Sequence, residues 1–204
     1  MTRITCKQCR RAGESLCGRD KCAFKTRPFA PGKLDSEKKH RSQFSEYGQQ
    51  MREKQKIKQV YGISEKQFVA YVNNAQKTTV TTKIAPTLGI YTSLETRLDN
   101  IVFRIGFAKN RALARQMVAH GHIMVNGKRI SIPSHKVKVG DVITVREGSK
   151  ATKLFAEFPA KEKDFSQVAW LATDAAKMEA KVLSLPKEVE SWFDFAKVLE
   201  FYNK

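Results

Sequence analysis

Four cysteines lie within the first 22 residues of the chain, and the sequence contains no others. They follow the spacing C-x2-C-x7-C-x4-C and are Cys6, Cys9, Cys17 and Cys22. Four thiolates can close a tetrahedral Zn²⁺ site, and a C-x2-C pair supplies two of them from one tight turn. Because no His or carboxylate is placed to leave an open coordination position, we expect a structural Zn²⁺ and not a catalytic one.

Other uses of the same thiols stay open on the sequence alone. An iron–sulfur cluster takes the same four ligands, and a redox-sensing metal regulator would need thiols that exchange. Two disulfides are disfavoured in a reducing compartment. Basic residues surround the cluster and favour its thiolate form. They are Lys7, Arg10, Arg11, Arg19 and Lys21.

A large excess of positive charge is the second chemical feature. The 204 residues carry 38 Lys and Arg against 20 Asp and Glu, a net charge of +18. Residues 1–60 carry 16 basic against 6 acidic side chains, residues 93–150 carry 11 against 4, and residues 161–204 carry 7 against 8. Such an excess repels itself in a compact chain, so a polyanionic partner is expected, and nucleic acid is the first candidate.

The candidate RNA-binding residues form three groups. The first, in the N-terminal loop and the linker after it, is Arg10, Arg11, Lys38, Lys39 and Arg41. The second lies along a helix predicted to begin after residue 45. Its members are Tyr47, Arg52, Lys54, Lys56 and Lys58. The third is Arg97, Arg104, Lys109, Asn110, Arg111, Arg115, His120, Lys128 and Arg129. Few aromatic residues interleave with the cations of this last group, so we expect contacts with the backbone of a folded RNA and not base stacking.

Helices are predicted to position the second group. Ser45 is placed to cap a helix that Gly62 ends by taking the left-handed conformation. Ser64 is placed to cap a second helix with an apolar stripe. Residues 77–83 are predicted to form a loop or a short extended segment, because Thr, Val and Lys dominate there.

The third group belongs to a predicted α+β module over residues 93–148. One helix is expected to start at Ser93 and to end at Gly106, and another to start at Asn110. Asn126 and Gly127 form the residue pair that a type I′ hairpin turn prefers. Further short strands are predicted up to residue 145, around a turn at Gly140.

Several segments together resemble one known family. RLDNIVFRIGFA at 97–108, HGHI at 120–123 and VNG at 125–127 resemble the αL RNA-binding module, which is named after bacterial small-subunit ribosomal protein number four. SEYG at 45–48 and LEFYNK at 199–204 resemble the helical domain of that protein, and the cysteine cluster is similar to its zinc-binding branch. The resemblance covers nearly the whole chain.

This resemblance implies a fold and a function. It implies an α+β chain in which a mostly helical domain, built from N- and C-terminal segments, receives the αL module as an insertion. It also implies binding to the 5′-domain junction of small-subunit rRNA early in assembly, contacts with neighbouring ribosomal proteins including number five, and a part in the channel through which mRNA enters. By position, Lys38, Lys39 and Arg41 would face the mRNA.

Four segments follow from this organisation. Residues 1–42 would be the four-cysteine metal loop and linker, 43–92 the first part of the helical domain, 93–148 the αL module, and 149–204 a C-terminal segment that packs back on the helical domain. The aromatic and apolar residues expected to make that packing are Trp170, Leu171, Trp192, Phe193, Phe195 and Phe201.

The alternative function is an RNA-modifying enzyme that carries an αL module. Asp99 and Asp174 are the isolated acids that could serve as catalysts, but we expect Asp99 to pair with an Arg and Asp174 to cap the helix after it. No stretch approaches the roughly 18 consecutive apolar residues of a membrane helix, and the start lacks an apolar signal region. We therefore expect a non-enzymatic, cytoplasmic ribosomal protein without a membrane partner.

Overall fold

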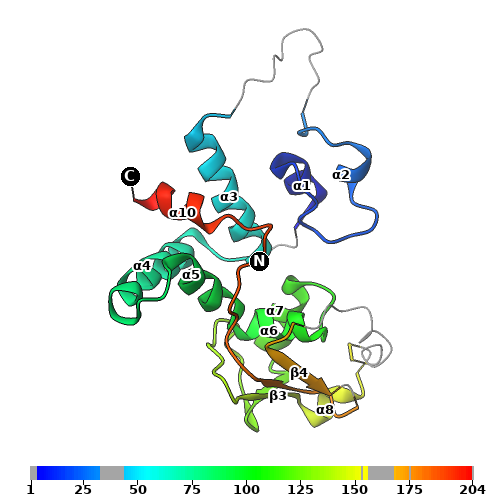
Figure 1. Ribbon diagram of the computed structural model, residues 1–204. Coiled ribbons are helices and arrows are strands. Elements are labelled where there is room, and N and C mark those ends of the chain that lie inside the picture. The colour runs from blue at the N-terminus through cyan, green and yellow to red at the C-terminus, as the bar shows by residue number, and fades with distance from the viewer. Residues whose placement is uncertain (1–3, 33–43, 153, 156–167, 175, 204) are drawn as a thin grey trace. The chain divides into compact units, whose positions relative to one another are not determined.

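The computed structural model describes residues 4–32, 44–152, 154–155, 168–174 and 176–203 (Figure 1). The chain divides into two compact units. The first, called the helical unit below, is Met1–Asn74 with Glu190–Lys204, and the second, called the sheet unit, is Ala75–Val189. The predicted α+β class is confirmed, because a helical unit from both ends of the chain accompanies a small antiparallel sheet.

Helix α3 (Glu46–Tyr61) is the longest helix that lies wholly within the helical unit. It begins where the backbone N–H of Gly48 donates to Ser45 Oγ at 3.2 Å, and it ends at Gly62, whose φ of 60° is left-handed. Both predicted ends are therefore confirmed. Helix α4 (Glu65–Thr82) follows, with Ser64 Oγ accepting the backbone N–H of Gln67.

Helix α10 (Phe195–Tyr202) packs against α3, so the two ends of the chain share one core (Figure 1). Phe193 lies between Tyr61 and Trp192, with ring centroids 5.6 and 4.7 Å away. Phe201 contacts Tyr47 at 5.5 Å. The prediction that Phe193 and Phe201 pack on the first helices is thus confirmed, and Phe195 is buried with its ring 5.8 Å from that of Phe193. The remaining short helices of this unit are α1 (Cys6–Ala12) and α2 (Ala23–Thr26).

The sheet unit contains a five-stranded antiparallel sheet in the order β2-β1-β3-β5-β4. Its strands are β1 (Ile123–Val125), β2 (Lys128–Arg129), β3 (Val142–Val145), β4 (Leu171–Asp174) and β5 (Glu179–Val182). Its helices are α5 (Pro86–Glu95), α6 (Leu98–Ile105), α7 (Arg111–Ala119) and α8 (Glu147–Lys150). Apolar residues of α6 and α7 share one core with β1, β3 and β5.

The hairpin turn between β1 and β2 agrees with the sequence. Asn126 and Gly127 both have positive φ, 50° and 76°, which a type I′ turn requires. Asn110 caps α7, since its Oδ1 accepts the backbone N–H of Leu113 at 2.9 Å. Gly106 ends α6 with a φ of 93°. The predicted cap of α7, the predicted end of α6 and the predicted hairpin turn are therefore confirmed.

Four expectations about local structure were wrong. The single helix expected from Ser93 to Gly106 is interrupted at Thr96 and Arg97: α5 ends before these residues and α6 begins after them. There the backbone pairs with residues 135–137: the N–H of Val137 donates to Thr96 O and that of Leu98 to His135 O, both at 2.9 Å. Residues 77–82 belong to α4 and are not extended.

The third correction concerns Trp170 and Leu171, and the fourth concerns Asp174. Both lie in the core of the sheet unit and not on the first helices. They lead into β4, which pairs with β5, and β5 in turn pairs with β3. Asp174 caps no helix; its Oδ1 accepts the backbone N–H groups of Ala176 and Lys177 in the turn between β4 and β5.

Among the described residues, no helix combines the length and the apolar character that crossing a membrane would require.

Candidate metal centre and nucleic-acid interface

The thiols of Cys6, Cys17 and Cys22 converge, with their Sγ atoms within 4.8 Å of one another. Cys6 begins α1, where Thr5 and Gln8 cap the helix and the N–H of Thr5 donates to Gln8 Oε1 at 2.7 Å. The C-x2-C pair is thus held by one helical turn. Gly13 then ends α1 in the left-handed conformation, with a φ of 77°.

Cys9 lies beside this group of three thiols and is not one of its members. Its side chain is fully buried, and its thiol interacts with Cys17 and Cys22. Burial, reinforced by the hydrogen bond with Cys17, raises the pKa of Cys9 to about 12. The pKa of Cys22 is lowered to about 6: burial acts to raise it, but hydrogen bonds from Ser15 and from the backbone N–H of Phe24 outweigh that effect.

The three convergent thiols could share one metal ion. Sulfur atoms bound to Zn²⁺ at about 2.3 Å in a tetrahedron lie about 3.8 Å apart. The three convergent thiols need only small inward movements to reach that separation, and all four cysteines are free thiols. The donor set is all sulfur, which suits Zn²⁺ or an iron–sulfur cluster.

The lysines expected to cover α3 with positive charge are largely paired within the helical unit. Lys54 is 6% exposed and its Nζ lies 2.9 Å from Glu65 Oε1, while Lys58 pairs with the other oxygen of Glu65. Lys56 is 7% exposed and pairs with Glu14 at 2.9 Å. These lysines connect α3 to the loop after α1 and to the start of α4, and their ammonium groups are paired with carboxylates.

Glu65 is the centre of this arrangement. Besides Lys54 and Lys58, it accepts a hydrogen bond from Tyr202 Oη of α10 at 2.8 Å. Burial acts to raise the pKa of Glu65, but hydrogen bonds from Lys54, Lys58 and Tyr202 lower it to about 2. The pKa of Tyr202 is raised, first by burial and then by its hydrogen bond to Glu65.

The other expected contacts of the helical unit lie nearer the surface. Arg52 is exposed, stacks over the ring of Phe44 at 3.8 Å and donates to the carbonyl oxygen of Arg11. Arg10 donates from Nε to Phe29 O at 2.8 Å. Tyr47 is 55% exposed. Lys38, Lys39 and Arg41 lie outside the described residues.

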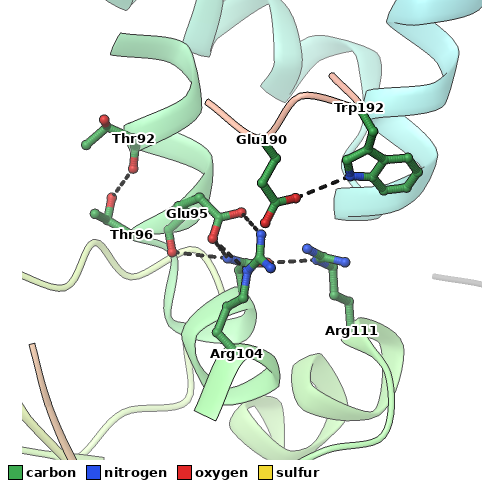
Figure 2. A network of polar contacts seen from close by, with 8 residues as sticks. Thr92, Glu95, Thr96, Arg104, Arg111, Glu190 and Trp192 are labelled. Atoms are coloured by element: carbon green, nitrogen blue, oxygen red, sulfur yellow. Dashed lines mark hydrogen bonds and ion pairs between the residues drawn. The ribbon is translucent and has the colours of Figure 1, made fainter. Parts of the chain in front are cut away.

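In the sheet unit, Arg104 and Arg111 belong to a polar network around Glu95 (Figure 2). The side chain of Glu95 is fully buried. Arg104 donates from Nε and Nη2 to its two oxygens at 2.8 and 2.9 Å, and Asn100 Nδ2 donates to Oε2 at 3.0 Å. Arg111 donates to Asn100 Oδ1 at 2.7 Å and stacks on Phe103.

Arg97 is also committed to the fold. It is 1% exposed and grips Asp99 with Nε and Nη2, at 3.0 and 2.6 Å. Arg115 Nη1 lies 3.6 Å from the same carboxylate. The expectation that Asp99 pairs with an Arg is therefore confirmed. Burial places Arg97 away from any surface that an RNA could reach, which contradicts its expected role in phosphate contact.

Exposed basic groups gather instead around the β1–β2 hairpin and the end of α7. The expected residues among them are His120, Lys128 and Arg129, and Lys109 is exposed before α7. Arg129 donates to His120 O and passes so close to Gly121 that a Cβ there would lie 2.1 Å from its Nε. Gly121 therefore allows the Arg129 side chain to cross the chain at the end of α7.

His122 and Arg146 were not among the residues predicted from the sequence. The register of β1 and β3 places Ile123 opposite Val145, so the adjacent residues His122 and Arg146 are neighbours. The N–H of Arg146 donates to His122 O at 2.9 Å. The pKa of His122 is lowered by burial first and then by the charges of His120, Arg146 and Arg129. The pairing of β1 with β3 brings His122 and Arg146 together, and their positions along the chain give no sign of it.

Comparisons with known proteins agree on one family. Residues 96–143 match the S4 domain, and residues 1–87 match the Ribosomal protein S4/S9 N-terminal domain. The chain is 40% identical to the small ribosomal subunit protein uS4 of Halothermothrix orenii, with 98% of this chain and 96% of the relative covered. The chain belongs to the uS4 family.

Other members of the family are similar over the same length. The uS4 protein of Caldicellulosiruptor saccharolyticus is 41% identical, with 98% of this chain and 96% of the relative covered. That of Clostridium tetani is 40% identical, with 100% and 98% covered. Within this chain, the S4 domain spans α6, α7 and the first three strands of the sheet, up to Ile143 in β3. The exposed basic groups around the hairpin therefore lie on the S4 domain and directly after it.

Proposed function

We propose that this chain is a structural, non-enzymatic constituent of the small ribosomal subunit that binds the 5′-domain junction of small-subunit rRNA early in assembly. The observation that carries the proposal is the separation of two classes of cation in the S4 domain. Arg97 and Arg104 are committed to buried carboxylates, whereas Lys109, Lys128 and Arg129 are exposed. Exposed cations can release the counterions of RNA phosphates, and buried ones cannot.

The same proposal assigns the partners and the metal. Neighbouring ribosomal proteins, including small-subunit protein number five, and mRNA at the entrance channel are proposed as partners because the chain belongs to the uS4 family. Lys38, Lys39 and Arg41 are the residues proposed to face mRNA. A structural Zn²⁺ held by Cys6, Cys9, Cys17 and Cys22 would stiffen the basic loop that contains Arg10 and Arg11. The domain boundaries at residues 42, 92 and 148 remain part of this proposal.

The RNA-modifying alternative needs an acid that is free to act on a base. Asp99 is held by Arg97, and Asp174 accepts two backbone N–H groups in a turn. Both acids therefore have structural roles in this fold, which favours the binding function.

RNA affinity at several salt concentrations tests the proposal. The double variant Lys128→Glu with Arg129→Glu should bind a transcript of the rRNA 5′ domain more weakly. It should also reduce the slope of log affinity against log salt by about 1 for each phosphate that the variant no longer neutralises. The matched control is Lys177→Glu with Lys181→Glu, which makes the same change of charge at two exposed positions of the β4–β5 hairpin, on the other side of the sheet from β2. An equal weakening in the control would contradict a localised interface.

A further inference from the structure

Arg19 lies in the connection between α1 and α2 and reaches into the thiol cluster. Its Nη1 is 3.9 Å from Cys6 Sγ, within the distance of a hydrogen bond to sulfur. Its Nη2 donates to the carbonyl oxygen of Ile4 at 2.8 Å. One planar guanidinium therefore engages both the Cys6 thiol and the backbone two residues before it. Such a fork fixes direction as well as charge, which the single ammonium of a lysine does not.

The third nitrogen of the same group also needs an explanation. Arg19 Nε is buried and has no hydrogen-bond partner among the described residues. A buried polar group of a cation without a partner costs free energy unless a nearby charge offsets it. A Zn²⁺ ion with four thiolates carries a formal charge of about −2, so the metal-loaded cluster would compensate the guanidinium.

We propose that Arg19 is a positioning residue of the metal centre: held on Ile4 O, its guanidinium orients Cys6 and offsets the negative charge of the tetrathiolate. This inference rests on the metal centre proposed above and deepens it. Residues that orient ligands from outside the coordination sphere contribute strongly to metal affinity, and their removal typically weakens binding by about 10- to 100-fold. Arg19 is not itself a ligand, because a guanidinium has no lone pair to offer.

The first test measures Zn²⁺ affinity of the full-length chain by competition with a coloured chelator such as 4-(2-pyridylazo)resorcinol. Arg19→Met should weaken binding by about tenfold or more. The matched control is Lys21→Met, which removes the same charge from an exposed side chain beside Cys22. The control should keep the affinity of the unaltered chain. An equal weakening in both variants would show a general charge effect and overturn the inference.

A spectroscopic test separates positioning from mere loop stability. Co²⁺ bound by thiolates gives a sulfur-to-metal charge-transfer band, and an N–H donor lowers the energy of the sulfur lone pairs. Saturated with Co²⁺, Arg19→Met should therefore show this band at lower energy than the unaltered chain, and Lys21→Met should not. Arg19→Lys keeps the charge but lacks the fork, and we expect it to resemble Arg19→Met. An unshifted band in both Arg19 variants would overturn the inference.

The two proposals fail in different ways. If the unaltered chain binds neither Zn²⁺ nor Co²⁺, the metal centre itself is wrong, and the role of Arg19 falls with it. If the unaltered chain binds both ions and the Arg19 variants match it in affinity and spectrum, the metal centre stands and only the role of Arg19 is wrong.

Discussion

Arg104 and Lys128 are both basic side chains of the sheet unit, and their surroundings give them different roles. Arg104 is bound through two nitrogens to the fully buried Glu95, whereas Lys128 is exposed on β2. Removing one partner of a buried ion pair leaves the other charge uncompensated, which costs about 3–5 kcal/mol. For RNA binding, Lys128 should matter more than Arg104, because only the exposed cation can reach a phosphate.

The first prediction follows from this contrast. Arg104→Met should lower the free energy of unfolding of the full chain by about 3 kcal/mol, because Glu95 loses its cation. Lys128→Met should change it by less than about 0.5 kcal/mol, as is usual for an exposed side chain. Urea unfolding followed by circular dichroism measures both. Equal stabilities of the two variants would mean that the Glu95 network does not hold this unit together.

The second prediction concerns Glu65 and pH. The pKa of Glu65 is lowered from 4.5 to about 2, chiefly by hydrogen bonds from Lys54, Lys58 and Tyr202 acting against burial. A carboxyl whose pKa is lower in the folded state stabilises the fold above its unfolded pKa. That contribution is lost as the pH falls from about 4.5 towards 2. The stability advantage of the unaltered chain over Glu65→Gln should therefore be full at neutral pH and should shrink in acid.

Urea unfolding of the two chains over this pH range measures that difference. Protonation of the thiols and loss of metal affect both chains, so those effects cancel in the comparison. Glu188→Gln is the control, because Glu188 is an exposed carboxylate outside the helices, and an equal pH dependence in both variants would indicate a general effect of removing a carboxylate. A pH-independent difference for Glu65→Gln would contradict the role assigned to this ion-pair centre.

At the scale of the elements, the helix ends are what the sequence predicts best. Ser45, Gly62 and Asn110 act through hydrogen bonds or backbone conformations that span only a few residues. The type I′ turn at Asn126 and Gly127 is equally local. Such signals need no knowledge of the rest of the fold, which is why they could be identified before it was known.

The elements that were missed depend on distant partners. The break at Thr96 exists because the backbone pairs with residues near 136, some forty positions later. Strand β5 pairs with β3 across a segment that includes residues 156–167, which lie outside the described part of the chain. Residues 77–82, by contrast, form helix although Thr and Val favour strands; they continue a helix that begins at Glu65, and extending an existing helix is easier than starting one.

The third prediction tests the start of α10. Asp194 Oδ1 accepts the backbone N–H of Lys197 at 3.1 Å, and this bond holds the first turn of the helix that packs on α3. Asp194→Ala should lower the free energy of unfolding by about 1 kcal/mol, whereas Asp194→Asn, which keeps a capping oxygen, should lower it by less. Thermal and urea unfolding measure the effect. Equal decreases in the two variants would exclude capping as the cause.

For the whole molecule, the sequence identifies which side chains are charged but not which are free. Of the cations chosen on α3, Lys54 and Lys56 are buried against Glu65 and Glu14. Glu14 is some forty residues from Lys56 along the chain, so no local pattern predicts that pair. The cysteine cluster is the opposite case, because all its members lie within one short segment. Its composition alone was enough to predict a shared site.

The last prediction concerns removal of the metal. Among the described residues before the linker, the buried apolar side chains are Cys9, Leu16 and Cys22, so this segment has almost no core besides its thiols. The core of the sheet unit draws on none of these residues. A strong chelator should therefore abolish amide protection in α1 and α2, because metal binding supplies their folding free energy. Protection in α6, α7 and β3 should persist. Hydrogen exchange measured by mass spectrometry before and after chelation tests this prediction. If α6 and α7 also lose protection, the two units fold as one and the proposed division of the chain is wrong.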